Sequence, residues 1–235
     1  YVENDGTTFE YNRVSLRAGG LYIVNCINIT NIHCIFSHNE ARAGGGIYIK
    51  HCEHVVTIHT IFKSNKATYF GGGFEGMETP ENSIFQYEGE TGGGLFIKNC
   101  KIVMTINTKF EYNKALSSCG ALFIYNSNNV VITNNIYARN EGKAGAGLLL
   151  IHVKYIMIIQ TVFKENRIVT DNAYGWSFII WRFQYSRVPR PGVPHGEKHS
   201  KGGGLHVQGC ECLQITNSKF VNQKSNGAIY AWNSS

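Results

Sequence analysis

Apolar and polar positions along this chain recur with a period near 26 residues. Glycine clusters precede short apolar segments, and an aromatic-x-x-Asn motif interleaves with most of these clusters. The register within a copy does not slip, whereas the connection to the next copy varies in length. This pattern is typical of a repeat protein whose copies stack on one another. Counted from the first apolar residue after the glycines, six copies begin at Leu21, Ile47, Leu95, Leu122, Leu148 and Leu205.

Equivalent positions predict two stacked columns. We expect the aromatic rings to be buried and the asparagines to occupy a bend. Asn tolerates the left-handed backbone, and stacked amides can hydrogen-bond from copy to copy. The glycines are expected to let the chain turn tightly into the first strand. The aromatic column is Phe36, Phe62, Phe110, Tyr137, Phe163 and Phe220, and the asparagine column is Asn39, Asn65, Asn113, Asn140 and Asn166.

Together these features predict an all-β chain, a right-handed parallel β-helix (solenoid) of about eight coils with about 26 residues per coil. Two regions depart from the repeat, an irregular short coil at 74–94 and a proline-containing surface insertion at 176–201. The chain opens and stops within a repeat and shows no signal sequence. We therefore expect residues 1–235 to be a single β-helix segment of a longer chain, with both ends acting as stacking surfaces.

The composition of the chain limits the classes of partner that it could bind. The 43% hydrophobic and 16% charged residues suit a folded chain with a substantial core. The formal net charge is +6, but lysines and arginines are scattered singly, which argues against a nucleic-acid partner. The longest apolar run, 147–151, is too short for a membrane segment.

The glycine-apolar motif paired with Phe-x-x-Asn resembles the repeats of the chlamydial polymorphic outer membrane proteins and of similar right-handed β-helix repeat proteins. The similarity runs from Phe9 to Trp232. In that family the repeats form an exported, adhesive passenger. The resemblance therefore implies an extracellular protein, secreted or at the cell surface, that adheres to something.

Parallel β-helices also include polysaccharide lyases and hydrolases, so an enzyme of this kind would need clustered catalytic side chains in the sequence. The chain has only two aspartates, Asp5 and Asp171, and these enzymes use clustered carboxylates. Five glutamates gather in the irregular coil, but no pair has a spacing that would fix two carboxylates across a sugar bond. We expect no catalytic residue and no cofactor. These glutamates are Glu75, Glu78, Glu81, Glu88 and Glu90.

Histidine and cysteine raise the question of a metal or a disulfide. His33 and His59 share their repeat position with Asn107 and Asn134, which indicates a polar column and no metal site. Four of the seven cysteines, Cys26, Cys52, Cys100 and Cys210, also share one column. Only Cys26 and Cys52 fall in consecutive coils, where a Cα separation of ~5 Å would permit a disulfide. A buried apolar column of free thiols is the alternative.

Two further groups of residues are candidates for surface chemistry. Asn28 and Asn233 begin N-glycosylation sequons. In the insertion, Trp181, Phe183 and Tyr185 alternate with polar residues, and Arg187 and Arg190 follow, so a strand there would show aromatics on one face. Such a face could contact a glycan or a partner protein, or pack back onto the coils.

The expected function is a non-catalytic, extracellular, structural or adhesive β-helix module within a larger rod, filament or surface assembly. Its partners would be further β-helix from the same chain or other copies, with a glycan or cell-surface protein as a further candidate. A carbohydrate-binding or polysaccharide-degrading protein with a pectate-lyase-like fold remains the alternative.

Overall fold

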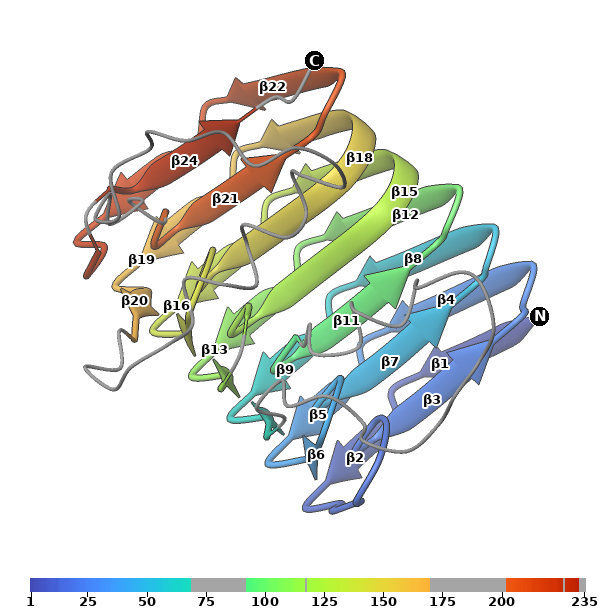
Figure 1. Ribbon diagram of the computed structural model, residues 1–235. Helices are drawn as coiled ribbons and strands as arrows, with labels where there is room; N and C mark the ends of the chain where they lie inside the picture. Colours follow the sequence, from blue (N-terminus) through green and yellow to red (C-terminus); the bar gives the residue numbers. More distant parts are fainter. Residues whose placement is uncertain (69–91, 117, 170–201, 226, 233–235) are drawn as a thin grey trace, which may run out of the picture.

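The computed structural model describes residues 1–68, 92–116, 118–169, 202–225 and 227–232. Within these ranges the chain is all-β, with 24 strands in three parallel sheets and no helix (Figure 1). Each repeat contributes strands to the same sheets in the same order. This arrangement is compatible with the expected β-helix.

The largest sheet has twelve strands and contains two columns of them. The first column holds β3 (Leu21–Val24), β7 (Ile47–Lys50), β11 (Leu95–Lys98), β21 (Leu205–Gln208) and β24 (Ile229–Trp232). The second holds β1 (Val2–Asp5), β4 (Asn28–Ile32), β8 (His54–Ile58), β12 (Ile102–Ile106) and β22 (Cys212–Thr216). Two long strands, β15 (Leu122–Thr133) and β18 (Leu148–Ile159), run through both columns.

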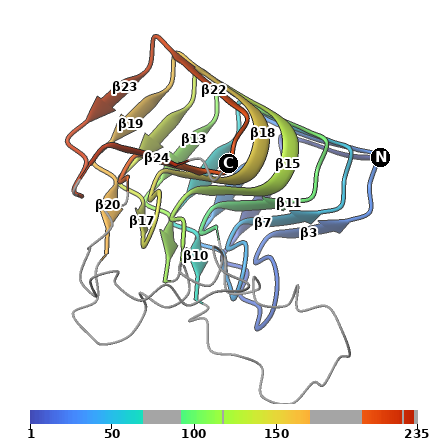
Figure 2. The same ribbon diagram turned by 45° about the horizontal axis from the view of Figure 1, so that its top comes forward.

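Two smaller sheets complete each repeat. The seven-stranded sheet comprises β2 (Thr8–Glu10), β5 (Ile35–Ser37), β9 (Ile61–Lys63), β13 (Lys109–Glu111), β16 (Ile136–Ala138), β19 (Val162–Lys164) and β23 (Lys219–Val221). The five-stranded sheet comprises β6 (Glu40–Ala41), β10 (Lys66–Ala67), β14 (Lys114–Ala115), β17 (Glu141–Gly142) and β20 (Arg167–Ile168). In Figure 2 the equivalent strands of successive repeats lie behind one another.

Strand pairing places like residues beside like, as the repeat register predicts. Ile47 of β7, for example, is the partner of Leu21 on one side and of Leu95 on the other. Because side chains alternate between faces, this register points the same positions inward in every repeat. The resulting core is a set of Ile, Val, Leu and Phe columns that are almost fully buried.

The pairing shows which copies of the repeat are neighbours. β7 pairs directly with β11, and β9 pairs directly with β13, so no strand lies between those repeats. The described strands fall into six coils between two partial ones, β1 and β2 before them and β24 after them, which agrees with the expected number of about eight. The irregular coil expected at 74–94 therefore does not add a layer here, and residues 69–91 lie outside the described residues. The insertion at 176–201 also lies outside them, and β18 still pairs with β21 across it.

The bends between strands use residues with left-handed backbone. Asn25, His33 and His38 have φ of 58°, 52° and 53°, one after each of three successive strands. The polar column of His33 and His59 keeps this conformation in the other repeats, at Asn107, Asn134, Gln160 and Asn217. Polar side chains suit these positions because they face solvent and because Asn adopts this conformation readily.

The glycines allow neighbouring repeats to approach each other closely, and they also allow the backbone to turn. A Cβ on Gly45 would lie 2.4 Å from the backbone oxygen of Gly93 in the next repeat, so any side chain there would force the repeats apart. Gly44 has a φ of 64° and so also meets the expected conformational requirement.

Candidate functional site

The aromatic column forms the centre of the core. Phe36, Phe62, Phe110, Tyr137 and Phe163 are fully buried and stack with ring centroids 4.8–5.1 Å apart. Phe9 and Phe220 extend the stack at its two ends, at 4.7 Å and 4.6 Å, and are only partly buried. The structure thus places the expected rings in one column whose two ends are open.

The asparagine column forms a ladder beside the rings. The Asn113 side-chain amide donates to Asn140 Oδ1 at 3.0 Å and to the Phe62 backbone oxygen at 2.9 Å. The Asn140 oxygen also accepts the Asn113 backbone N–H at 3.0 Å. The pattern recurs from Asn39 to Asn166 and closes on Gln223. Every polar atom of this unit has a protein partner, so the ladder stabilises the stack and offers nothing to a ligand.

One expectation about this column is wrong. The asparagines themselves do not have positive φ. The residue before each of them does, as at Tyr112, Arg139 and Glu165. The asparagine side chain points inward to its hydrogen bonds, so the exposed residue before it takes up the bend. We call this column of exposed or partly exposed residues the bend ridge; it consists of Tyr11, His38, Ser64, Tyr112, Arg139, Glu165 and Asn222.

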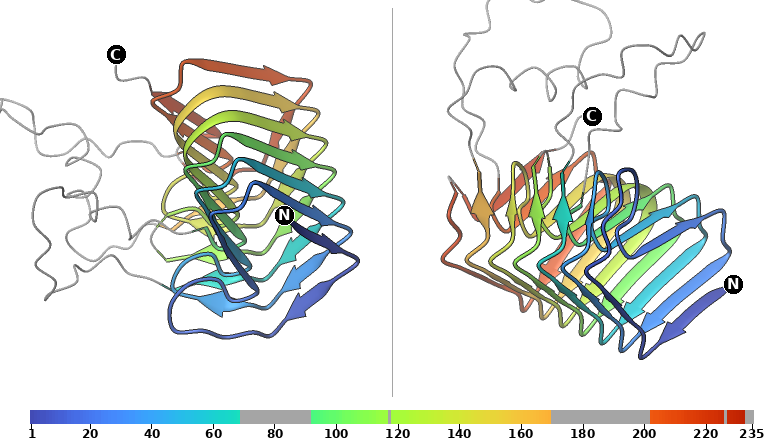
Figure 3. Two further views of the ribbon diagram at one scale, coloured as in Figure 1. Left: turned by 90° about the vertical axis from the view of Figure 1, so that its right-hand side faces the viewer. Right: turned by 90° about the horizontal axis from the view of Figure 1, so that it is seen from below.

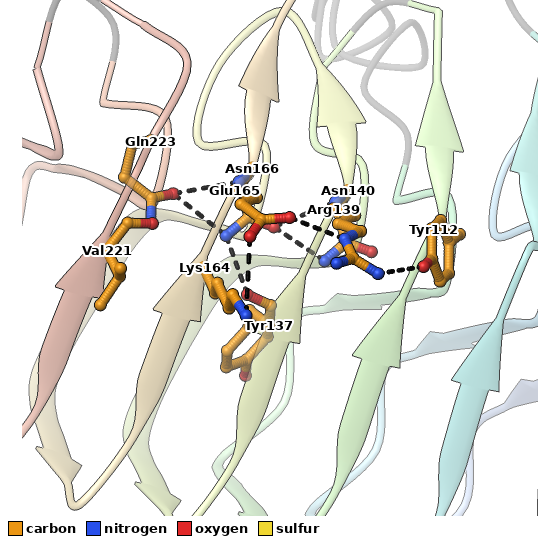
Figure 4. A network of polar contacts seen from close by, with 9 residues as sticks. All are labelled: Tyr112, Tyr137, Arg139, Asn140, Lys164, Glu165, Asn166, Val221 and Gln223. Carbon is orange, nitrogen blue, oxygen red and sulfur yellow. Dashed lines mark hydrogen bonds and ion pairs between the residues drawn. The ribbon is translucent and has the colours of Figure 1, made fainter.

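The bend ridge carries the polar network of Figure 4. Arg139 lies between Tyr112 and Glu165, donating to the Tyr112 hydroxyl and, through Nε, to Glu165 Oε2 at 2.7 Å. Its guanidinium also lies 5.5 Å from the centre of the Tyr112 ring. Lys164 Nζ is 3.6 Å from the other Glu165 oxygen. The hydrogen bond from Arg139 lowers the pKa of Glu165, which therefore stays ionised near neutral pH.

A second charged column follows the five-stranded sheet. Glu40 lies 3.4 Å from Arg13 and 3.7 Å from Lys66. Glu141 lies 3.1 Å from Lys114 and 2.6 Å from Arg167. Partial burial of Glu141 raises its pKa, but the two cations outweigh that effect and the net pKa is lowered. These carboxylates are paired anions, which suits cross-strand stabilisation better than proton donation.

All seven cysteines are free in the structure, so of the two alternatives for Cys26 and Cys52 it has the column of free thiols and not the disulfide. In-register side chains point the same way and keep roughly the ~4.8 Å strand spacing, whereas a disulfide needs Cβ atoms ~3.8 Å apart. The Cys26 backbone N–H instead donates to Cys52 Sγ at 3.4 Å. Cys100 follows Cys52 in the next repeat, so the consecutive set has three members and not two. Burial raises the pKa of Cys100 to about 12.

The histidine pair is arranged as a stack. The His33 and His59 rings are nearly parallel, with centroids 5.3 Å apart, and His33 Nδ1 is 3.3 Å from Asp5 Oδ1. Parallel rings hold their nitrogens side by side and do not converge on a point. Among the described residues, no group of three or more His, Cys, Asp or Glu side chains is placed to hold a metal ion.

Of the sequence-based surface candidates, the structure describes one. Asn28 is half-buried at the start of β4, with its Oδ1 2.7 Å from His54 Nδ1. The second sequon, at Asn233, lies outside the described residues. So do the five glutamates from Glu75 to Glu90 and the contact candidates Trp181, Phe183, Tyr185, Arg187 and Arg190.

Sequence reasoning missed the bend ridge and the charged column. Residue identity along the ridge is mixed, so no recurring letter marks it. The charged column is visible only as a repeat position that carries a charge of either sign, at Glu40, Lys66, Lys114, Glu141 and Arg167. Reading charge by repeat position would have found it.

No family model, no curated protein and no solved structure matches this chain. In the part of the chain that the structure describes, no helix is long and apolar enough to cross a membrane.

Proposed function

We propose that this chain is a right-handed parallel β-helix that serves as a non-catalytic structural or adhesive module, stacked end to end with further β-helix. It would be secreted or displayed at a cell surface, as the repeat resemblance implies. The partner at each end would be more of the same chain or another copy. Adhesion to a glycan or a surface protein is the natural use of such a rod.

The observation that carries this proposal is the open hydrophobic core. Val2 and Phe9 at one end, and Leu213 and Phe220 at the other, pack on the core but remain partly exposed. In the part of the chain described, β1 and β2 pair on one side only, as do β22 and β23. Unpaired parallel edges above an open core are competent to accept further strands. Figure 1 shows these two sets of strands at opposite ends of the stack.

The charge arrangement favours a scaffold over an enzyme. Glycoside hydrolysis needs one carboxyl group whose pKa is raised so that it can donate a proton. The pKa values of Glu53, Glu141 and Glu165 are instead lowered, with a lysine or arginine beside each. Each of these groups is held as a paired anion.

Two glutamate substitutions in the last repeat test end stacking. Leu213→Glu puts a carboxylate on the open core, whereas Lys219→Glu puts one on the outer surface of the same repeat. We expect the unmodified chain to form particles that lengthen with concentration in sedimentation velocity and electron microscopy. Leu213→Glu should abolish that growth, and Lys219→Glu should leave it unchanged.

Circular dichroism checks that both variants keep their β-structure. The proposal would be contradicted if both the isolated chain and the native protein formed compact particles, no longer than one chain's stack of repeats, at every concentration. Rods in the native protein combined with monomers of the isolated chain would assign the ends to the same polypeptide.

A further inference from the structure

The outer face of the second strand column carries two ladders of partly exposed Ile, Val, Met and Thr side chains, beside a third and more polar ladder of Asn28, His54, Ile102, Asn129 and Tyr155. The first ladder runs Thr30, Val56, Met104, Val131 and Met157, and the second runs Ile32, Ile58, Ile106, Thr133 and Ile159. The buried side chains of these strands alternate with them and point inward. We call this surface the lateral face. Figure 3 shows its strands β4, β8 and β12 side by side along one side of the stack.

The two ladders of the lateral face contain no charge in five consecutive repeats. Met157 is 40% exposed, and the other nine ladder side chains are partly exposed. A contiguous aliphatic surface of this kind is unusual on a protein that works alone. The corresponding outward position of the seven-stranded sheet, by contrast, includes Lys109 and Lys219.

The chemistry of the two ladders of Ile, Val, Met and Thr favours an apolar partner over a sugar. Sugar rings stack on aromatic side chains, and neither ladder has one. A flat array of aliphatic side chains at the strand spacing is instead matched by an identical array, as in sheets packed face to face about 10 Å apart.

Both ends of the lateral face are polar, and this polarity selects an orientation. The ladders begin at Glu3 and Asp5 and finish at Gln214 and Thr216. Two copies packed with their stacks parallel would set Glu3 and Asp5 against the same residues of the partner. Antiparallel packing sets these carboxylates against Gln214 and Thr216, which can donate hydrogen bonds, and so avoids the like-charge contact.

We propose that two copies of this chain pair through their lateral faces in antiparallel orientation, with a two-fold axis at Met104. In this register Met104 faces its own symmetry mate, and Val56 of one copy faces Val131 of the other. Thr30 then faces Met157. The pairing is isologous, as in most homodimers.

The size of the face predicts a weak, reversible dimer. Seven repeats at ~4.8 Å and three outward positions per strand give a face of roughly 400 Å² per copy. The total, about 800 Å², lies below the range of stable complexes. If end stacking occurs as proposed above, every added module extends the same face, and laterally paired rods would gain affinity by avidity.

Complementary charge variants test the register. All are made in the Leu213→Glu background, so that end stacking does not contribute, and in unglycosylated protein, because a glycan on Asn28 would obstruct this face. Val56→Lys alone and Val131→Glu alone should each remain monomeric at concentrations where the parent is dimeric. Their equimolar mixture should dimerise, because the introduced ammonium group of one copy then meets the introduced carboxylate of the other, while the second contact stays valine to valine.

Two controls make the outcome specific. A mixture of Val56→Lys with Val56→Glu should stay monomeric, and recovery in that mixture would indicate parallel packing and overturn the proposed register. Ile136→Lys places the same charge on the neighbouring sheet, beside Lys109, and should leave the dimer intact. A parent that stays monomeric at millimolar concentration would overturn lateral pairing and leave the proposal of end stacking standing.

Discussion

The buried aromatic and asparagine columns hold neighbouring repeats together one residue at a time. Phe110 stacks on Phe62 and Tyr137 at 4.8 Å. The Asn113 side-chain amide links three repeats, because it donates to the Phe62 backbone oxygen on one side and to Asn140 Oδ1 on the other. Loss of such a residue leaves a cavity or unpaired polar groups that a close-packed stack cannot absorb. The neighbouring ridge residues are exposed or partly exposed, so their loss leaves no comparable cavity.

Phe110→Ala should lower the free energy of unfolding by roughly 3–5 kcal/mol, because a fully buried ring is replaced by a cavity. Chemical denaturation measures the change. Tyr112→Ala, two residues away on the bend ridge, should cost less than about 1 kcal/mol, because its ring is 46% exposed. Equal losses in the two variants would show that the column is not the core.

The lowered pKa values of two histidines predict that the folded chain loses stability in acid. Burial lowers the pKa of His152, and burial together with Lys50 and Lys98 lowers the pKa of His51. A depressed folded-state pKa means that the unfolded chain binds more protons, so stability falls as pH drops below the unfolded value near 6.5. His51→Asn and His152→Asn should flatten this fall. Asn is the natural control, because it holds the same bend at Asn99 and Asn126.

Thermal unfolding followed between pH 7.5 and 5 compares these variants with the parent. A pH dependence that survives both substitutions would assign it to other groups.

At the scale of the strand, the register in which strands of neighbouring repeats pair decides which side chains point inward. Each strand inside the stack pairs with the equivalent strand of the repeat on either side, so a whole inner repeat is a removable unit. Strands β15 and β18 show this best, since ten of their residues pair in register across both columns. A shift of one residue would instead turn every apolar side chain of a strand outward.

Deletion of residues 122–147, which removes one complete repeat, should yield a folded chain, because Leu148 then takes the place of Leu122 against β11 and β12. Circular dichroism and a cooperative thermal transition would report the fold. A deletion that is one residue shorter, 122–146, keeps Gly147 and so only lengthens the connection before Leu148 by one residue.

A sharper control deletes 122–147 together with Val153, which lies inside the register. The second column of that repeat then slips by one residue, and the variant should aggregate or unfold. Comparable stability of this variant and the in-register deletion would contradict the pairing.

At the scale of the whole molecule, the chain is a stack with open ends, an uncharged side and paired charges along its bends. None of these features gathers acid and base around a cavity. The chain should therefore show no turnover of polygalacturonate in a reducing-end or unsaturated-product assay. Activity that disappears in Glu88→Gln or Glu90→Gln would contradict this expectation and restore the enzyme alternative.

The sequence by itself determined the parallel stacking of repeats, the aromatic column and the amide ladder, because each recurs at one position and identical neighbours must meet in an in-register stack. It could not determine that the repeat at Ile47 stacks directly on the one at Leu95, since a long connection and a short coil look alike until pairing is known. The left-handed residues at Tyr112, Arg139 and Glu165 were also hidden, because any exposed side chain can occupy that bend. Only the tertiary structure decided that the cysteines of the column lie unpaired at the strand spacing, and that Ile, Val, Met and Thr side chains from five repeats form one continuous outer face.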